Sequence, residues 1–172
     1  MRHQFFNEFE TWLTRRGSYR RYQSRQPFWS TWSTGSYTFS EYKVLWKEMS
    51  GSRFCAAYIT PCDDPVLGRR VVIPDHKLYF VPVDSLQEAR YLTGILNAPV
   101  ISTAIAGYAA QLSLGTSVIE NLTIPAFDAE DNRHTEIARL AGRITDRGGE
   151  PTQRELSRLN ELAHEIVAEH GN

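Results

Sequence analysis

Hydrophobic residues follow a helical spacing at the two ends of the chain and a strand-like pattern between them. Over residues 4–16 the apolar side chains fall on one broad aromatic face, which predicts a helix that docks on another surface. After residue 41, short runs rich in β-branched and aromatic residues alternate with Gly, Pro and Asp, as is typical of strands. These runs are YKVLWKEM, FCAAYI, RRVVI and KLYFVPV.

Helix signals follow these strands. Ser85 and Glu88 form a capping box in front of a helical stripe, which ends where Asn97 precedes Pro99. Pro99 stands where a second helix can begin. Residues 122–127, LTIPAF, are expected to form a further strand that ends at Pro125.

The C-terminal region predicts two more helices joined by a tight turn. The first begins at Asn132 or Thr135 and ends at residues 148–149, which are both Gly. The second follows a capping box made by Thr152 and Glu155. Two amphipathic helices with so short a connection are expected to form an antiparallel helical hairpin.

The charge of the chain is unevenly distributed. The 172 residues contain 19 Lys and Arg against 20 Asp and Glu, and the resulting net charge of -1 argues against a protein that coats nucleic acid. Residues 1–80, however, carry 12 basic and 7 acidic residues (+5), whereas residues 81–172 carry 7 and 13 (-6). Only the first half of the chain therefore has the positive charge that would favour an anionic partner.

Cysteine usage and hydropathy indicate a cytoplasmic protein. Cys55 and Cys62 are too few for a disulfide framework and lack the neighbouring ligands of a zinc site, so we expect two reduced thiols and no metal. The N-terminus has no apolar signal region, and no segment reaches the roughly 18 apolar residues of a membrane span. We therefore expect no membrane partner.

Known catalytic motifs are absent from the sequence, with one short exception. Asp75 and Lys77 match the D-x-K half of a PD-(D/E)xK nuclease motif, with Asp63 or Asp64 upstream. Such enzymes hold Mg²⁺ with two carboxylates while a Lys positions the attacking water. So short a match also arises by chance, and the alternative is a surface turn at Asp75 followed by the start of a strand.

A basic and aromatic segment covers residues 15–47. Arginine guanidinium groups bind phosphate oxygens bidentately and read guanine edges, and aromatic rings stack on exposed bases. The alternative for Phe28, Trp32 and Phe39 is a place in the core, and for the arginines a solvated surface.

Three stretches, in the same order, resemble the target-recognition region of bacterial N-6 adenine DNA methyltransferases and single-chain restriction-modification enzymes of the type IIG kind. The first is RGSYRRYQ followed by PFWSTWSTGSYTFSEYKVLWKEM, and the second is VIPDHKLYFVPVDSLQEARYLTGILNAPV. The third, AAQLSLGTSVIENLTIPAFD followed by HTEIARLAGRI, is also similar to an element of type I specificity subunits. The resemblance spans residues 5–147.

This resemblance implies an α+β fold, with a small twisted, mostly antiparallel sheet, packed helices and the C-terminal helical hairpin. It implies a module that reads double-stranded DNA in the major groove while a separate domain methylates adenine. The chain has no N-P-P-Y/F motif and no methyl-donor site. We therefore expect no catalytic residue and no cofactor in this chain, with S-adenosylmethionine bound by a methyltransferase catalytic domain.

That domain belongs either to the same full-length chain or to a separate subunit, so the chain is a C-terminal piece or a free-standing module. Residues 1–25 are expected to form the N-terminal helix and a linker that dock on it, residues 26–130 the target-recognition domain and residues 131–172 the hairpin. The nuclease and a module that only docks on protein remain the alternatives. The expected DNA contacts are Arg20, Arg21, Arg25, Ser33, Thr34, Ser36, Thr38, Lys43 and Lys47, with His76 and Lys77 as a second group.

Overall fold

The computed structural model describes residues 2–48, 54–109 and 122–170. It divides the chain into two compact units, Met1–Thr38 and Phe39–Asn172, and each is described here by itself. The expected functional division at residues 25 and 130 therefore differs from these units, since residues 26–38 belong to the first unit and the hairpin belongs to the second.

The first unit contains short helices. They are α1 (Arg2–Asn7), α2 (Glu10–Thr14), the π-helix η1 (Tyr19–Gln23) and the start of the 3-10 helix η2 (Ser36–Phe39). The prediction of one continuous helix over residues 4–16 was wrong. Phe9 has φ -103° and ψ 3°, outside the helical region, and its amide donates to the Phe6 carbonyl in a tight turn (2.9 Å).

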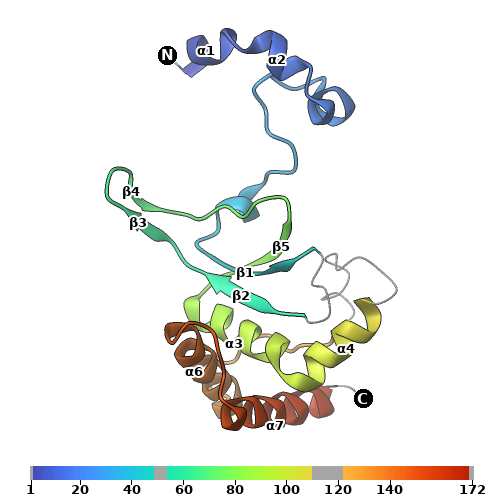
Figure 1. Ribbon diagram of the computed structural model, residues 1–172, viewed down its shortest axis with the longest axis vertical. Coiled ribbons are helices and arrows are strands. Elements are labelled where there is room, and N and C mark those ends of the chain that lie inside the picture. Colours follow the sequence, from blue (N-terminus) through green and yellow to red (C-terminus); the bar gives the residue numbers. More distant parts are fainter. Residues whose placement is uncertain (1, 49–53, 110–121, 171–172) are drawn as a thin grey trace. The chain divides into compact units, whose positions relative to one another are not determined.

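The second unit is built on a three-stranded antiparallel sheet with strand order β2-β1-β5 (Figure 1). The strands are β1 (Tyr42–Lys47), β2 (Ala56–Ile59) and β5 (Leu78–Val83). A separate antiparallel pair, β3 (Cys62–Asp64) and β4 (Gly68–Arg70), lies in the connection from β2 to β5. The small, antiparallel sheet is therefore confirmed.

Helix α3 (Leu86–Asn97) lies between this sheet and helix α6 (Asn132–Asp146), as Figure 1 shows. Ser85 caps α3 by accepting a hydrogen bond from the Glu88 amide (3.1 Å), as the capping box predicts. The helices approach closely at Gly94, where an added Cβ would lie 2.5 Å from Cγ2 of Ile137. Absence of a side chain at residue 94 thus fixes the distance between α3 and α6.

The C-terminal end of α3 is tied to strand β2 by one side chain. Asn97 Oδ1 accepts a hydrogen bond from the Ala56 amide (2.9 Å), and Asn97 Nδ2 donates to the Ala56 carbonyl (2.8 Å). Ala56 is buried, so both of these backbone groups need a partner inside the protein. In the sequence Asn97 marks the end of a helix, but in the structure its side chain provides hydrogen-bond partners for the backbone of β2.

Helices α6 and α7 (Gln153–His170) pack together as the expected C-terminal hairpin. Gly148 and Gly149 form the turn with φ of 97° and 88°, values that favour glycine. The second capping box is also confirmed, because the Thr152 amide donates to Glu155 Oε2 (2.9 Å) and the Glu155 amide donates to Thr152 Oγ1 (3.3 Å). With α4 (Pro99–Ala109) packed on α7, the unit has the predicted α+β class.

The strand expected over residues 122–127 does not form. Leu122, Ile124 and Phe127 pack individually against the core, and Pro125 supplies its carbonyl to the Tyr91 hydroxyl (3.2 Å). The apolar pattern of this segment therefore reflects packing on helices. The sequence also predicts a turn or short strand over residues 111–115 and a short helical turn over residues 117–121, but these segments lie outside the described residues.

The close approach at Gly94 predicts a steric effect on stability. Gly94→Ala should destabilise the protein by about 1–3 kcal/mol, because the new methyl group overpacks against Ile137. The free energy of unfolding from urea titration measures the change. Gly107→Ala in α4 is the control, since an added Cβ there meets no described atom within 4 Å; equal destabilisation by both changes would contradict the packing argument.

The bridge from Asn97 to Ala56 predicts a second effect. Asn97→Ala should cost about 1–3 kcal/mol for each backbone group left without a partner. Asn97→Asp should also destabilise, because a carboxylate cannot donate to the Ala56 carbonyl. Urea titration measures both, with Gln87→Ala, an exposed change on the same helix, as the control. Stability unchanged in both Asn97 variants would contradict this role.

Candidate nucleic-acid interface

The first unit is organised around the side chain of Arg16. Its Nη2 donates to the Phe28 carbonyl (2.8 Å) and the Ser30 carbonyl (3.0 Å), and its Nε donates to the Leu13 carbonyl (2.9 Å). One guanidinium therefore connects helix α2 to the loop after residue 26. The sequence shows Arg16 only as one of several arginines, and no local pattern distinguishes it.

Three further arginines of this unit face solvent. Arg20 and Arg21 lie on η1, and Arg25 lies just after it; all three are exposed and form no ion pair with any residue that the structure describes. The arginines of the C-terminal helices differ, since several are paired with carboxylates, such as Arg133 with Asp131 (2.6 Å) and Arg158 with Glu136 (2.8 Å). The unpaired guanidinium groups of η1 thus remain available to an anionic ligand.

An aromatic pair lies beside Arg21. The rings of Tyr22 and Trp32 stack with centroids 4.7 Å apart and an angle of 16° between their planes. Their exposed fractions are 54% and 52%, and the Arg21 guanidinium lies 5.6 Å from the centre of the Tyr22 ring. The alternative of a core position is therefore wrong for Trp32, and also for Phe39, which is 63% exposed; Phe28 is half-buried.

The loop after Trp32 presents short polar side chains. Ser33, Thr34 and Ser36 are exposed. Ser33 has a φ of 58°, unusual for a residue other than glycine, and its carbonyl accepts a hydrogen bond from the Tyr37 hydroxyl (2.8 Å). Since Trp32 stacks on Tyr22 of η1, the start of this loop lies against η1 at the surface of the first unit.

Thr38 does not belong to that surface. It is buried, and its hydroxyl accepts a hydrogen bond from the Gly35 amide (3.1 Å). The prediction of a DNA contact at Thr38 is corrected, because this hydroxyl closes the turn that contains η2.

Lys43 is corrected for a similar reason. Its side chain is fully buried, and Nζ donates to the carbonyls of Ser40 and Val72, the latter at 3.1 Å. Burial lowers the pKa of this ammonium group because the charged form loses hydration. Lys43 therefore stabilises the start of β1 and is inaccessible to a phosphate. Lys47, at the other end of β1, is exposed.

His76 and Lys77 are exposed in the turn before β5 and lie in the second unit, as Lys47 does. Asp75 Oδ1 lies 2.8 Å from His76 Nδ1 and accepts a hydrogen bond from the His76 amide (2.7 Å). The side-chain contact first, and then the amide bond, lower the pKa of the Asp75 carboxyl. Lys77 Nζ lies 3.7 Å from Glu48 Oε2. The structure therefore places the predicted contacts in two groups, one in each compact unit.

The nuclease alternative gains no support from the geometry. Asp64 Oδ1 accepts hydrogen bonds from the amides of Val66 (2.8 Å) and Leu67 (2.7 Å), so it shapes the turn between β3 and β4. Among the described residues, no three His, Cys, Asp or Glu side chains gather closely enough to hold a metal ion. Cys55 and Cys62 are free thiols, as expected.

Comparison with protein-family models, curated proteins and solved structures finds no significant match. Of the helices that the structure describes, none combines the length and the apolar character needed to cross a membrane.

The role of Arg16 predicts a local loss of structure. Arg16→Ala should expose the backbone amides of the first unit to faster hydrogen exchange, because a charged hydrogen-bond donor contributes about 1.5–3 kcal/mol. Exchange of residues 5–38, followed by mass spectrometry, measures this effect. Arg15→Ala is the matched control, since Arg15 is exposed. Similar exchange in the two variants would show that Arg16 does not hold the unit together.

Proposed function

We propose that this chain is the DNA-sequence recognition module of a bacterial N-6 adenine DNA methyltransferase or restriction-modification enzyme, and that it is not catalytic by itself. The observation that carries the proposal is the surface of the first unit, where Arg20, Arg21 and Arg25 are exposed without an ion pair to any described residue and the exposed Tyr22 ring lies next to Arg21. The resemblance of three ordered sequence stretches to such modules supports it independently.

Electrostatics supports DNA as the ligand of this surface. Residues 1–38 contain six arginines and two glutamates, a net charge of +4. Positive charge that no carboxylate neutralises attracts the DNA backbone, and each phosphate contact releases condensed counterions. The acidic second half does not oppose such binding if its charges face protein or water.

Sequence reading needs groups that contact base edges. Arginine forms a bidentate pair with guanine, and serine and threonine hydroxyls bond to several bases. We propose that Arg20, Arg21 and Arg25 divide phosphate and base contacts with Ser33, Thr34 and Ser36. Lys47, His76 and Lys77 are further proposed contacts, and they lie in the second unit.

Methylation itself is assigned to a partner. We propose that a methyltransferase catalytic domain, in the same full-length chain or in a separate subunit, binds S-adenosylmethionine and the target adenine in the bacterial cytoplasm. The exposed aromatic side chains of the first unit offer a surface for this domain: Phe5, Phe9 and Trp12 are 65%, 42% and 72% exposed.

Salt dependence of DNA binding tests the proposal. Arg20→Ala and Arg25→Ala should each weaken binding to duplex DNA and lower the magnitude of the slope of log K against log salt by about 1, because each removes one phosphate contact. Fluorescence anisotropy with a duplex of random sequence, at several salt concentrations, measures both quantities.

Arg69→Ala is the control for charge. Arg69 is exposed, but it is paired with Glu41 (3.1 Å), so its removal should leave the salt slope nearly unchanged. Selection of bound duplexes from a random library tests sequence reading. Binding that does not vary with salt, or a library that shows no enriched sequence, would contradict the proposal; capture of a methyltransferase domain without any DNA binding would favour the docking module.

A further inference from the structure

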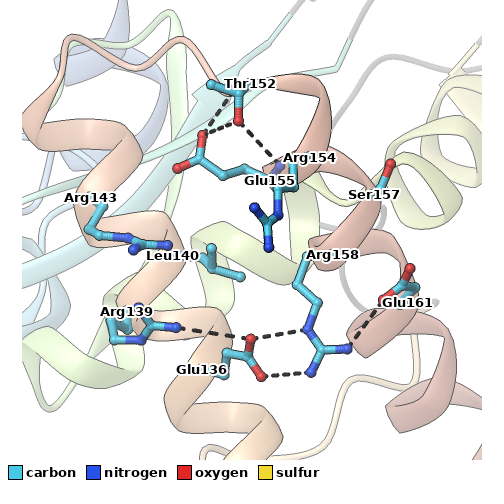
Figure 2. Close-up of a pocket in the computed structure, with 10 residues that line it drawn as sticks. All are labelled: Glu136, Arg139, Leu140, Arg143, Thr152, Arg154, Glu155, Ser157, Arg158 and Glu161. Carbon is cyan, nitrogen blue, oxygen red and sulfur yellow. Dashed lines mark hydrogen bonds and ion pairs between the residues drawn. The ribbon is translucent and has the colours of Figure 1, made fainter.

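A hollow of about 640 Å³ lies between the two helices of the C-terminal hairpin (Figure 2). Its wall carries four arginines, two from each helix: Arg139 and Arg143 on α6, and Arg154 and Arg158 on α7. Leu140 adds an apolar side chain to the wall. A positively charged hollow is unexpected here, because it lies in the acidic half of the chain.

The carboxylates of the hollow are already bound by arginines. Glu136 accepts two hydrogen bonds from Arg158, at 3.0 and 2.8 Å, and Arg158 also donates to Glu161 (3.2 Å). These two carboxylates therefore share one guanidinium, each of whose three nitrogens donates to them, as the dashed lines of Figure 2 show.

Glu155 also lines the hollow, and it is bound in a similar way. Its Oε2 accepts hydrogen bonds from Arg147 Nη2 (2.6 Å), the Thr152 amide (2.9 Å) and the Thr152 hydroxyl (2.8 Å). These bonds lower the pKa of the Glu155 carboxyl to about 2, and the bond from Arg147 has the largest effect. Glu155 thus stays ionised and paired at neutral pH.

Arg143 and Arg154 have no such partner. Neither guanidinium forms an ion pair or a hydrogen bond with a residue that the structure describes. Arg143 interacts with Glu136 only through longer-range charge attraction. Their side chains extend from opposite helices into the space between them (Figure 2). Arg139 is weakly engaged, with Nη2 4.0 Å from Glu136 Oε1.

Local charge follows from these pairs. Of the residues that line the hollow, the four arginines exceed the three glutamates, at positions 136, 155 and 161, by one charge. Two guanidinium forks that face one concave space match the oxygens of a phosphate group, which arginine binds bidentately. The volume falls in the range of small-ligand sites, so it admits a phosphate with an attached organic group.

We propose that Arg143 and Arg154 bind a phosphate group in the hollow between α6 and α7. Two sources share this chemistry: a free phosphorylated small molecule, or a phosphodiester of the DNA backbone. The site is separate from Arg20, Arg21 and Arg25, and the proposal does not depend on DNA recognition by the first unit.

Inorganic pyrophosphate is the probe for the test. Isothermal titration calorimetry of the full chain should show one pyrophosphate per chain, and Arg143→Gln with Arg154→Gln should weaken binding at least tenfold. Both arginines are exposed, so the double variant should fold, which circular dichroism checks.

Two control variants accompany this test. Arg143→Lys with Arg154→Lys keeps the charge but loses the planar fork, and should give an intermediate loss of pyrophosphate affinity. Arg69→Ala with Arg70→Ala removes the same charge from exposed positions outside both proposed sites and should leave pyrophosphate binding within twofold.

The outcomes separate the sources and the two proposals. If the Gln variant loses pyrophosphate binding and keeps its DNA affinity, the ligand is a free phosphate compound; if it loses both, the hollow binds a DNA phosphodiester. Unchanged pyrophosphate affinity in the Gln variant overturns the proposal, as does an equal loss in the Arg69 and Arg70 variant. Loss of DNA binding in Arg20→Ala or Arg25→Ala bears on the proposed function and not on this site.

Discussion

The close contact between α3 and α6 at Gly94 is the constraint on which the second unit depends. Helix α3 covers the sheet with one face and meets α6 with another, so the distance between these helices sets the thickness of the whole core. Side chains in the core are packed at the density of organic crystals, which leaves little freedom for that distance to change. Gly142 shows a related dependence, because the Arg90 side chain lies where its Cβ would be.

The electrostatic properties of the chain depend on which charges are paired. The net charge of -1 and the division into halves both hide this distinction. The Arg16 guanidinium donates to backbone carbonyls and the Arg158 guanidinium to carboxylates. The guanidinium groups of Arg20 and Arg154 have neither kind of partner among the described residues. A cation attracts an external anion more strongly when no anionic group of the protein lies close enough to neutralise it.

Much of the fold of the second unit could be predicted from local sequence. Both capping boxes, the paired glycines and the main strands depend on neighbours within a few residues, and the structure confirms them. The failures depend on distant partners. Residues 122–127 look like a strand but lie on helices, and Lys43 looks like a surface cation but meets the carbonyl of Val72.

The same reasoning applies to the candidate interface. Sequence alone indicates that arginines and aromatic residues alternate near the N-terminus, and this is what made Arg20, Arg21 and Arg25 candidates. It does not show that Arg16 is structural, or that Trp32 stacks on Tyr22 at the surface, because both depend on a loop that folds back. The DNA contacts themselves stay predictions.

Asn97 has a consequence for how this protein behaves toward other chains. Strand β2 is an outer strand of its sheet, and such a strand offers backbone donors and acceptors to which a foreign strand can add. The carboxamide of Asn97 already occupies the amide and carbonyl of Ala56, as an added strand would. A second strand can pair with this end of β2 only by displacing Asn97, so one side chain protects the edge of the sheet against self-association.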